Sequence, residues 1–302
     1  MKAIRLALDW TPNTNHIGFF VAQELGFYSE EGLEVQLLNP IDDNYAVTPA
    51  KKVEKGLAEM ALCPFESIIS YRIKRHPLDA VAMATIFQED LSAIVVLKES
   101  KIMDPKDLDG SSYASYKARY EDGIVKQMII NDGGTGDVEI AYPEKLGIWE
   151  TLLSKRYDAT WIFQNWEGVQ AKNKGIELRN FRLADYDIPY GYSPIIMTSK
   201  RKVDNDIGLY NAFLRASKRG FLYAKQNQEK AVNILRPFIS ESDKNIDLLM
   251  SQKDSAVAYG SDDEWGRMDK NRVNDFLDWL KQVELETQVL SYEELVYNTA
   301  DF

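Results

Sequence analysis

The side chains best suited to binding chemistry lie in one short polar stretch, residues 9–16, which reads Asp-Trp-Thr-Pro-Asn-Thr-Asn-His. Asp9, Asn15 and His16 supply a carboxylate, an amide and an imidazole. Trp10 adds a flat apolar face with one N–H donor. Together these groups can stack on a planar molecule and hydrogen-bond its edge. Two alternatives stay open: Trp10 packs under the next helix, and His16 has a structural role.

The flanking segments place this stretch at a strand end. Residues 3–8 alternate as a strand, and residues 17–25 have the apolar spacing of a helix. Pro12 and the Asn/Thr cluster preclude regular structure between them. In open α/β sheets ligands bind at the carboxyl ends of strands, so we expect a ligand site at this loop.

A second strand-to-helix junction carries further candidates. A short strand over residues 59–63 is followed by a helix over 64–73 that starts with Pro64 and contains Glu66 and Ser67. Glu66 is suited to accept from an exocyclic amine of a ligand, or it stabilises the helix N-terminus. Cys63 has no neighbouring His or Lys, and we interpret it as a small buried residue.

Residues 115–120 read Ser-Tyr-Lys-Ala-Arg-Tyr, the most charged and aromatic strand-to-helix junction between residues 93 and 193, which we interpret below as a second lobe. Tyr116 and Lys117 are candidate ligand contacts, and Lys117 with Arg119 offers cations to an anionic group. The loop lacks the glycines of a tight phosphate cradle.

Aromatic and polar side chains also follow a strand over residues 159–163. Alternation predicts that Trp161 is buried and that Asn165, Trp166 and Glu167 line a cleft. Farther on, two phenols flank Gly191, and hinge packing is the alternative to a role in binding. These phenols belong to Tyr190 and Tyr192.

Composition narrows the function classes. The net charge of −11 opposes a nucleic-acid partner, and no run approaches the roughly 20 apolar residues of a membrane span. His16 and His76 are the two histidines and Cys63 the single cysteine, without ligand spacing, so we expect no metal and no cofactor. No leader precedes the first strand, which predicts a cytoplasmic protein, or a periplasmic one whose signal has been removed.

Strand and helix patterns alternate through residues 1–198 and become helical from residue 207. This alternation predicts right-handed βαβ units and mainly parallel sheets. The length favours two domains. Apolar strands at 92–98 and 193–198 are interpreted as crossings between lobes. We therefore predict lobe 1 over residues 1–92 plus 194–302 and an inserted lobe 2 over 93–193.

The stretches 9–16, 20–28 and 31–35 resemble the opening of thiamine-pyrimidine proteins, which include formylaminopyrimidine-binding proteins of importers and hydroxymethylpyrimidine phosphate synthases. Residues 105–110 and 159–167 are similar in layout. The resemblance implies an α/β, two-lobed periplasmic-binding-protein-like fold of type II, with the second lobe inserted in the first, a helical C-terminal part and a ligand in the inter-lobe cleft.

The resemblance to the synthases fails at their reactive positions. The synthases carry a lysine for pyridoxal phosphate and a histidine one turn later, where this sequence has Cys63 and Ser67. Their cysteine-rich run is also absent from residues 190–194. Neither replacement supports that chemistry, whereas ligand binding is unaffected.

The leading hypothesis is a binding protein for a small planar heterocycle, a thiamine-pyrimidine precursor or analogue, held by aromatic stacking and carboxylate hydrogen bonds. The resemblance implies an ABC transporter permease as partner. A divergent synthase-like enzyme and an intracellular metabolite sensor are the alternatives.

Overall fold

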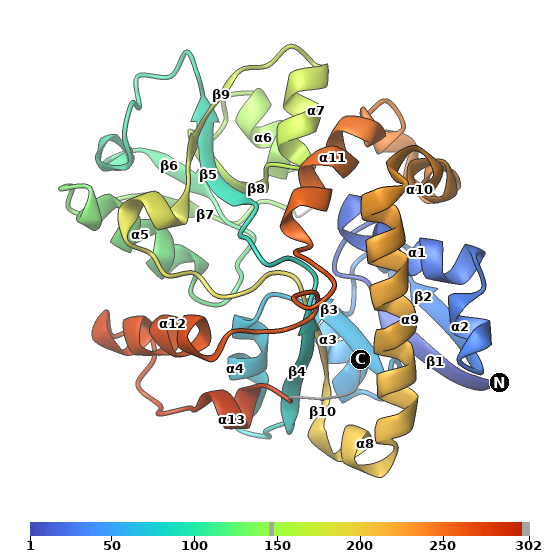
Figure 1. Ribbon diagram of the computed structural model, residues 1–302. Coiled ribbons are helices and arrows are strands. Elements are labelled where there is room, and N and C mark those ends of the chain that lie inside the picture. The colour runs from blue at the N-terminus through green and yellow to red at the C-terminus, as the bar shows by residue number, and fades with distance from the viewer. Residues whose placement is uncertain (145–147, 298–302) are drawn as a thin grey trace. The chain divides into compact units, whose positions relative to one another are not determined.

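The computed structural model describes residues 1–144 and 148–297 (Figure 1). The chain forms two compact units. Within these described residues, unit 1 comprises Met1–Asp90, Gly191–Val273 and residues 289–297, and unit 2 comprises residues 91–144, residues 148–190 and Asn274–Gln288. No helix among these residues has both the length and the apolar character needed to cross a bilayer.

Unit 1 is built on a five-stranded sheet with the order β2-β1-β3-β10-β4. Its strands are β1 (Lys2–Ala7), β2 (Leu33–Leu38), β3 (Met60–Cys63), β4 (Ala80–Thr85) and β10 (Ile195–Ser199). The parallel strands β2, β1 and β3 are joined by helices, whereas β10 runs antiparallel to β3 and β4. The central strands are buried, as expected for a sheet covered on both faces.

Helices fill the rest of unit 1. They are α1 (Ile17–Glu24), α2 (Phe27–Glu30), α3 (Pro49–Glu54), α4 (Glu66–Ile73), α8 (Lys200–Asn205), α9 (Ile207–Gln226), α10 (Gln228–Leu235), α11 (Leu248–Ala258) and α13 (Tyr292–Leu295). The helix after residues 9–16, α1, crosses α9 closely at Gly18 and Gly220. A Cβ at Gly220 would lie 2.0 Å from the Gly18 carbonyl oxygen, so this crossing fixes the helix that follows the polar loop.

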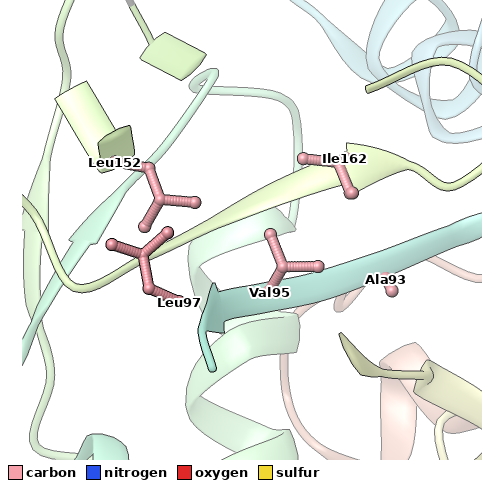
Figure 2. Close-up of a cluster of buried hydrophobic side chains, with 5 residues drawn as sticks. All are labelled: Ala93, Val95, Leu97, Leu152 and Ile162. Carbon is pink, nitrogen blue, oxygen red and sulfur yellow. The ribbon is translucent and has the colours of Figure 1, made fainter. Parts of the chain in front are cut away.

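Unit 2 has its own five-stranded sheet with the order β7-β6-β8-β5-β9. Its strands are β5 (Ser92–Leu97), β6 (Ser112–Ala114), β7 (Glu139–Ala141), β8 (Ala159–Phe163) and β9 (Leu178–Phe181), and its helices are α5 (Glu121–Asn131), α6 (Ile148–Leu153) and α7 (Glu167–Asn173). Figure 2 shows one of its cores, in which β5, β8 and α6 contribute Ala93, Val95, Leu97, Ile162 and Leu152.

In each sheet four of the five strands run in one direction, as the alternation predicts, and one strand runs against them. In unit 1, β10 is antiparallel to both neighbours, and in unit 2, β5 is antiparallel to β8 and β9. Both strands enter their sheet from the other unit rather than through a crossover helix, so no βαβ connection imposes a parallel direction on them.

The C-terminal helices divide between the units. Helix α12 (Lys270–Gln282) begins in unit 1 and continues in unit 2, followed there by residues up to Gln288. The predicted boundaries of residues 1–92 plus 194–302 and 93–193 differ from this division mainly at residues 274–288. Sequence periodicity identifies a helix but not the body on which its apolar face packs.

Candidate functional site

The polar loop of unit 1 lies at the edge of the sheet where predicted site residues gather. β1 and β3 are parallel with Ala7 opposite Ala61, and β10 begins opposite Cys63. The Phe65 N–H donates to the Tyr192 carbonyl oxygen at 2.9 Å. The predicted residues on these connections are Asp9, Trp10, Asn15, His16, Pro64, Glu66, Ser67 and Tyr192.

A fixed hydrogen-bond chain connects Asn13, His16 and Asp9. The Asn13 N–H donates to Nδ1 of His16 at 3.2 Å, and Nε2 of His16 lies 2.7 Å from Oδ1 of Asp9. Because Nδ1 accepts a hydrogen bond, it carries no proton, and the proton of the neutral ring is on Nε2. His16 is fully buried and therefore affects a ligand through Asp9, which it holds as a hydrogen-bond acceptor.

The side chain of Asp9 is partly exposed. Its exposed fraction is 23%, and within residues 1–144 and 148–297 Asp9 makes a single hydrogen bond, to His16. That hydrogen bond uses Oδ1, and a contact of Asp9 with a ligand stays a prediction. Asn15 is buried, and its backbone N–H donates to Oδ1 of Asn13 at 2.8 Å, which caps the short turn Thr14–His16.

Glu66 and Asp9 both lie near the Cys63 thiol. Burial raises the pKa of Cys63 well above its ordinary range, the negative charges of Asp9 and Glu66 raise it further, and a hydrogen bond with Ser67 partly opposes them. The thiol is therefore protonated at neutral pH, and its Sγ lies 3.8 Å from Sδ of Met197. Cys63 is a buried packing residue, as the sequence indicates. Pro64 is half-buried, and its carbonyl oxygen accepts from the Ser67 N–H at 3.0 Å.

Trp10 has an aromatic neighbour that sequence reasoning missed. Its ring centroid lies 5.3 Å from that of Tyr45 at 56°. Burial raises the pKa of Tyr45 to about 12, so its hydroxyl stays protonated at neutral pH. Tyr45 is on the loop after β2, the strand paired with β1. The rule that loops after neighbouring parallel strands share one edge was the signal available in the sequence.

A buried polar network supports the loop from below. The Thr14 hydroxyl lies 2.7 Å from Oγ of Ser251 and 3.0 Å from Oγ of Ser255 on α11. The Tyr259 hydroxyl donates to the Thr14 carbonyl oxygen at 3.1 Å. These side chains are fully buried, and a satisfied buried network fixes the position of its members. α11 therefore positions the turn that carries Asn15 and His16.

In unit 2, the loop after β6 is organised around Glu121, the first residue of α5. Its carboxylate accepts from the backbone N–H groups of Tyr116 and Ala118, each at 3.0 Å, and from the Tyr113 hydroxyl at 2.9 Å. The protein's own carboxylate therefore occupies the donors that an external anion would need. Lys117 is exposed with a positive φ of 60°.

Arg119, a candidate partner for an anionic group, already pairs with a carboxylate of its own unit. Its guanidinium pairs with Glu286, which also accepts from the Tyr120 hydroxyl at 2.6 Å. Two N–H groups, those of Thr287 and Gln288, donate to the other oxygen of this carboxylate. The cation is thus used to hold residues 286–288 in unit 2.

The second group of predicted residues in unit 2 follows β8. Trp166 is 2% exposed and Trp161 is partly exposed, the reverse of the prediction. The reason is that Ile162 packs in the core of Figure 2, which turns Trp161 to the opposite face. Asn165 is buried, and Glu167 accepts from the Phe163 N–H at 2.9 Å.

Both phenols near Gly191 are buried. Tyr190 contacts Trp161 and Phe276 edge-on, at centroid distances of 5.4 and 5.7 Å. Tyr192 is 2% exposed, and its hydroxyl accepts from the Asp269 N–H at 2.9 Å. Their direct contact with a ligand stays a prediction.

The remaining predictions concern isolated residues. His76 is exposed, and Trp265 and Trp279 are buried, as their sequence contexts indicate. In the described residues, no group of three or more His, Cys, Asp or Glu side chains is placed to hold a metal ion.

Comparisons with known proteins agree with this fold. The formylaminopyrimidine-binding protein of Halalkalibacterium halodurans is 24% identical over 85% of this chain and 76% of its own length. A putative thiamine biosynthesis protein of Haemophilus influenzae is 24% identical over 97% of this chain and 91% of its own. The alkanesulfonate-binding protein SsuA of Xanthomonas axonopodis, solved with MOPS bound, superposes with a TM-score of 0.74 at 9% identity, covering 98% of both chains.

The structural likeness confirms the predicted periplasmic-binding-protein-like α/β fold. The predicted family resemblance is confirmed as well, because residues 13–231 match the family described as NMT1/THI5 like. That match covers more than half of the sequence, and the chain belongs to the NMT1/THI5-like family.

Proposed function

We propose that this protein binds a small planar heterocycle, a thiamine-pyrimidine precursor or analogue, and delivers it to an ABC transporter permease. The observation that carries the proposal is the Asp9 carboxylate, which His16 holds as an acceptor next to the paired rings of Trp10 and Tyr45. A ring with an amino group can stack on the aromatics and donate to Asp9. Enclosure of the ligand between the two lobes stays a prediction.

The related proteins support the same ligand class. One relative is named for binding formylaminopyrimidine and the other for thiamine biosynthesis. A synthase-like activity has less support, because the position of the synthase lysine holds the buried, protonated thiol of Cys63. The position of the synthase histidine holds Ser67, whose hydroxyl is hydrogen-bonded to that thiol. Neither group forms a Schiff base with an aldehyde cofactor.

The test is calorimetric titration with formylaminopyrimidine and with a 4-amino-2-methylpyrimidine. For a ligand that binds the wild type, Trp10→Ala should weaken binding by more than about 1.5 kcal/mol, since the stacked ring loses both contact area and geometry. Trp10→Phe is the matched control and should keep most of the affinity. Equal affinities of the wild type and Trp10→Ala would exclude stacking on Trp10.

A further inference from the structure

One arginine contacts the chain segments beside the first two passages between the units. The chain leaves unit 1 after Asp90 and returns at Gly191. The guanidinium of Arg272 donates to the Gln88 carbonyl oxygen at 2.5 Å and to the Gly191 carbonyl oxygen at 2.7 Å. All of these atoms belong to unit 1, so the first and second crossings are joined at one side chain.

Each crossing segment is also tied separately to unit 1. The Gln88 N–H donates to the carbonyl oxygen of Ala258, the last residue of α11, at 2.6 Å. On the other crossing, Tyr192 accepts at its carbonyl oxygen from Phe65 and at its hydroxyl from Asp269. The two crossings therefore reach α11 and the loop after β3, which carry or support candidate ligand groups.

The geometry requires arginine. Its planar fork presents several N–H donors in fixed directions, so one guanidinium can bond two carbonyl oxygens at once, whereas the ammonium of lysine is a compact point charge. The guanidinium carbon also lies 4.0 Å from the centre of the Tyr192 ring, within the range of a cation–π contact. The backbone N–H of Arg272 donates to Oδ1 of Asp269 at 2.8 Å, and this hydrogen bond fixes the first turn of α12.

We propose that Arg272 is a positioning residue that holds the unit 1 ends of both crossings in register, so that they respond together to a change at either one. Arg272 does not touch the Asp9–Trp10 group and acts on it through the segments it holds. Its effect on ligand binding rests on the proposed function, whereas its effect on the crossings does not.

The experiment is amide hydrogen exchange on the full-length protein without ligand. The amide of Gln88 reports on the first crossing, and the amides of Phe65 and Asp269 report on the second. Arg272→Ala should accelerate exchange at both crossings by at least about tenfold. The matched control is Arg219→Ala, because Arg219 also lies over an aromatic ring, that of Phe27 at 4.1 Å, and pairs with a carboxylate, but touches neither crossing.

Unchanged exchange, or acceleration at one crossing alone, in Arg272→Ala would overturn the proposal. If that variant does not fold, Arg272→Lys decides, because it keeps a cation near Tyr192 but lacks the two separate nitrogens that donate to the Gln88 and Gly191 carbonyl oxygens. In Arg272→Lys, faster amide exchange at both crossings and nowhere else supports the proposal. Amide exchange rates equal to those of the wild type refute it.

Calorimetry with formylaminopyrimidine forms the second arm. If the wild type binds it, Arg272→Ala should lose at least about tenfold in affinity and Arg219→Ala should not. Wild-type affinity in Arg272→Ala would refute the link between the crossings and the ligand group. Absence of binding by the wild type would contradict the proposed function and leave the exchange result decisive for Arg272.

Discussion

Two strand-end loops of this protein, one in each unit, use a carboxylate in opposite ways. After β1, Asp9 is held by a neutral histidine and keeps 23% of its side chain exposed. After β6, Glu121 is 3% exposed and accepts from three donors of its own loop and strand. The first arrangement leaves acceptor capacity for a ligand, and the second satisfies the loop internally.

The difference shows that residue type at a strand end does not define a binding group. The unit 1 loop caps its own turn with the amide of Asn13, so that Asp9 remains accessible. In unit 2, the carboxylate caps the loop itself, because Glu121 is the first residue of α5. We therefore expect ligand recognition to depend on the unit 1 loop and stability to depend on the unit 2 loop.

The largest effect is expected from Glu121→Ala. The change removes the acceptor of the Tyr113 hydroxyl and of two backbone N–H groups. A buried donor without a partner costs about 1–3 kcal/mol, so we expect unfolding free energy to fall by about 2–4 kcal/mol. Chemical denaturation measures it. Asp42→Asn, at an exposed carboxylate, is the control and should change stability by less than about 0.5 kcal/mol.

Glu121 also predicts a pH dependence. Burial raises the pKa of Glu121 above its ordinary value, although the N–H groups of Ala118 and Tyr116 oppose the shift. At a pH between the pKa of Glu121 in the unfolded state and its higher pKa in the folded state, the folded protein binds more protons than the unfolded one. The resulting stabilisation is fully present below the unfolded-state pKa and is lost as the pH rises through the folded-state pKa. The stability of the wild type relative to Glu121→Gln should decrease over that interval. A difference that rises with pH would contradict this sign.

Asp9→Asn should have the next largest effect, on binding rather than on stability. Hydrogen bonds to charged groups contribute about 1.5–3 kcal/mol, so affinity for an aminopyrimidine that binds the wild type should fall by about 2 kcal/mol, or roughly 30-fold. Calorimetric titration measures it. A loss of about 2 kcal/mol in binding free energy in Glu121→Gln, with wild-type affinity in Asp9→Asn, would show that the unit 2 loop and not the unit 1 loop recognises the ligand.

The smallest effect is expected from Thr14→Val, which keeps the side-chain shape but removes the hydroxyl contacts to Ser251 and Ser255. The loss of buried hydrogen bonds should cost about 1–2 kcal/mol of unfolding free energy. Thr14→Ser, which retains the hydroxyl, should recover most of it. Nitrogen NMR provides a second readout, because the chain has only two histidines and His76 is exposed.

In that spectrum the wild-type His16 should show a single tautomer with its proton on Nε2. A loosened turn in Thr14→Val should give signals averaged between tautomers. Retention of the single tautomer together with wild-type stability would mean that α11 does not position this loop.

Much of the architecture was predictable from local pattern. Alternation gives the strands of both sheets, and the loop over residues 9–16 is marked by Pro12 and its polar neighbours. These features depend on neighbours in sequence, which the pattern contains. The antiparallel directions of β5 and β10 were not predictable in the same way, because they follow from passages between units.

The site was predictable as a position and less so as a set of partners. The sequence identifies Asp9 and His16, but not that the histidine proton is directed to the carboxylate, since this depends on the Asn13 N–H. Tyr45 and Glu121 were missed because their roles come from contacts across a sheet edge and within a folded loop. Trp161 was predicted to be buried and Trp166 to be accessible, and the structure has the opposite. Alternation therefore assigns side chains to the correct faces only when the face that packs in the core is known.

The packing of residues 274–288 on unit 2 bears on how the protein folds during synthesis. Glu286 binds Arg119 and Tyr120, and Leu285 lies so close to Gly123 that a Cβ there would be 2.3 Å from it. Unit 1 likewise needs residues 191–273. Domains usually fold as they emerge, N-terminal first. Here unit 1 is incomplete until residue 273 has left the ribosome, and unit 2 is incomplete until residue 288 has, so neither unit can finish folding while the first 190 residues alone are available.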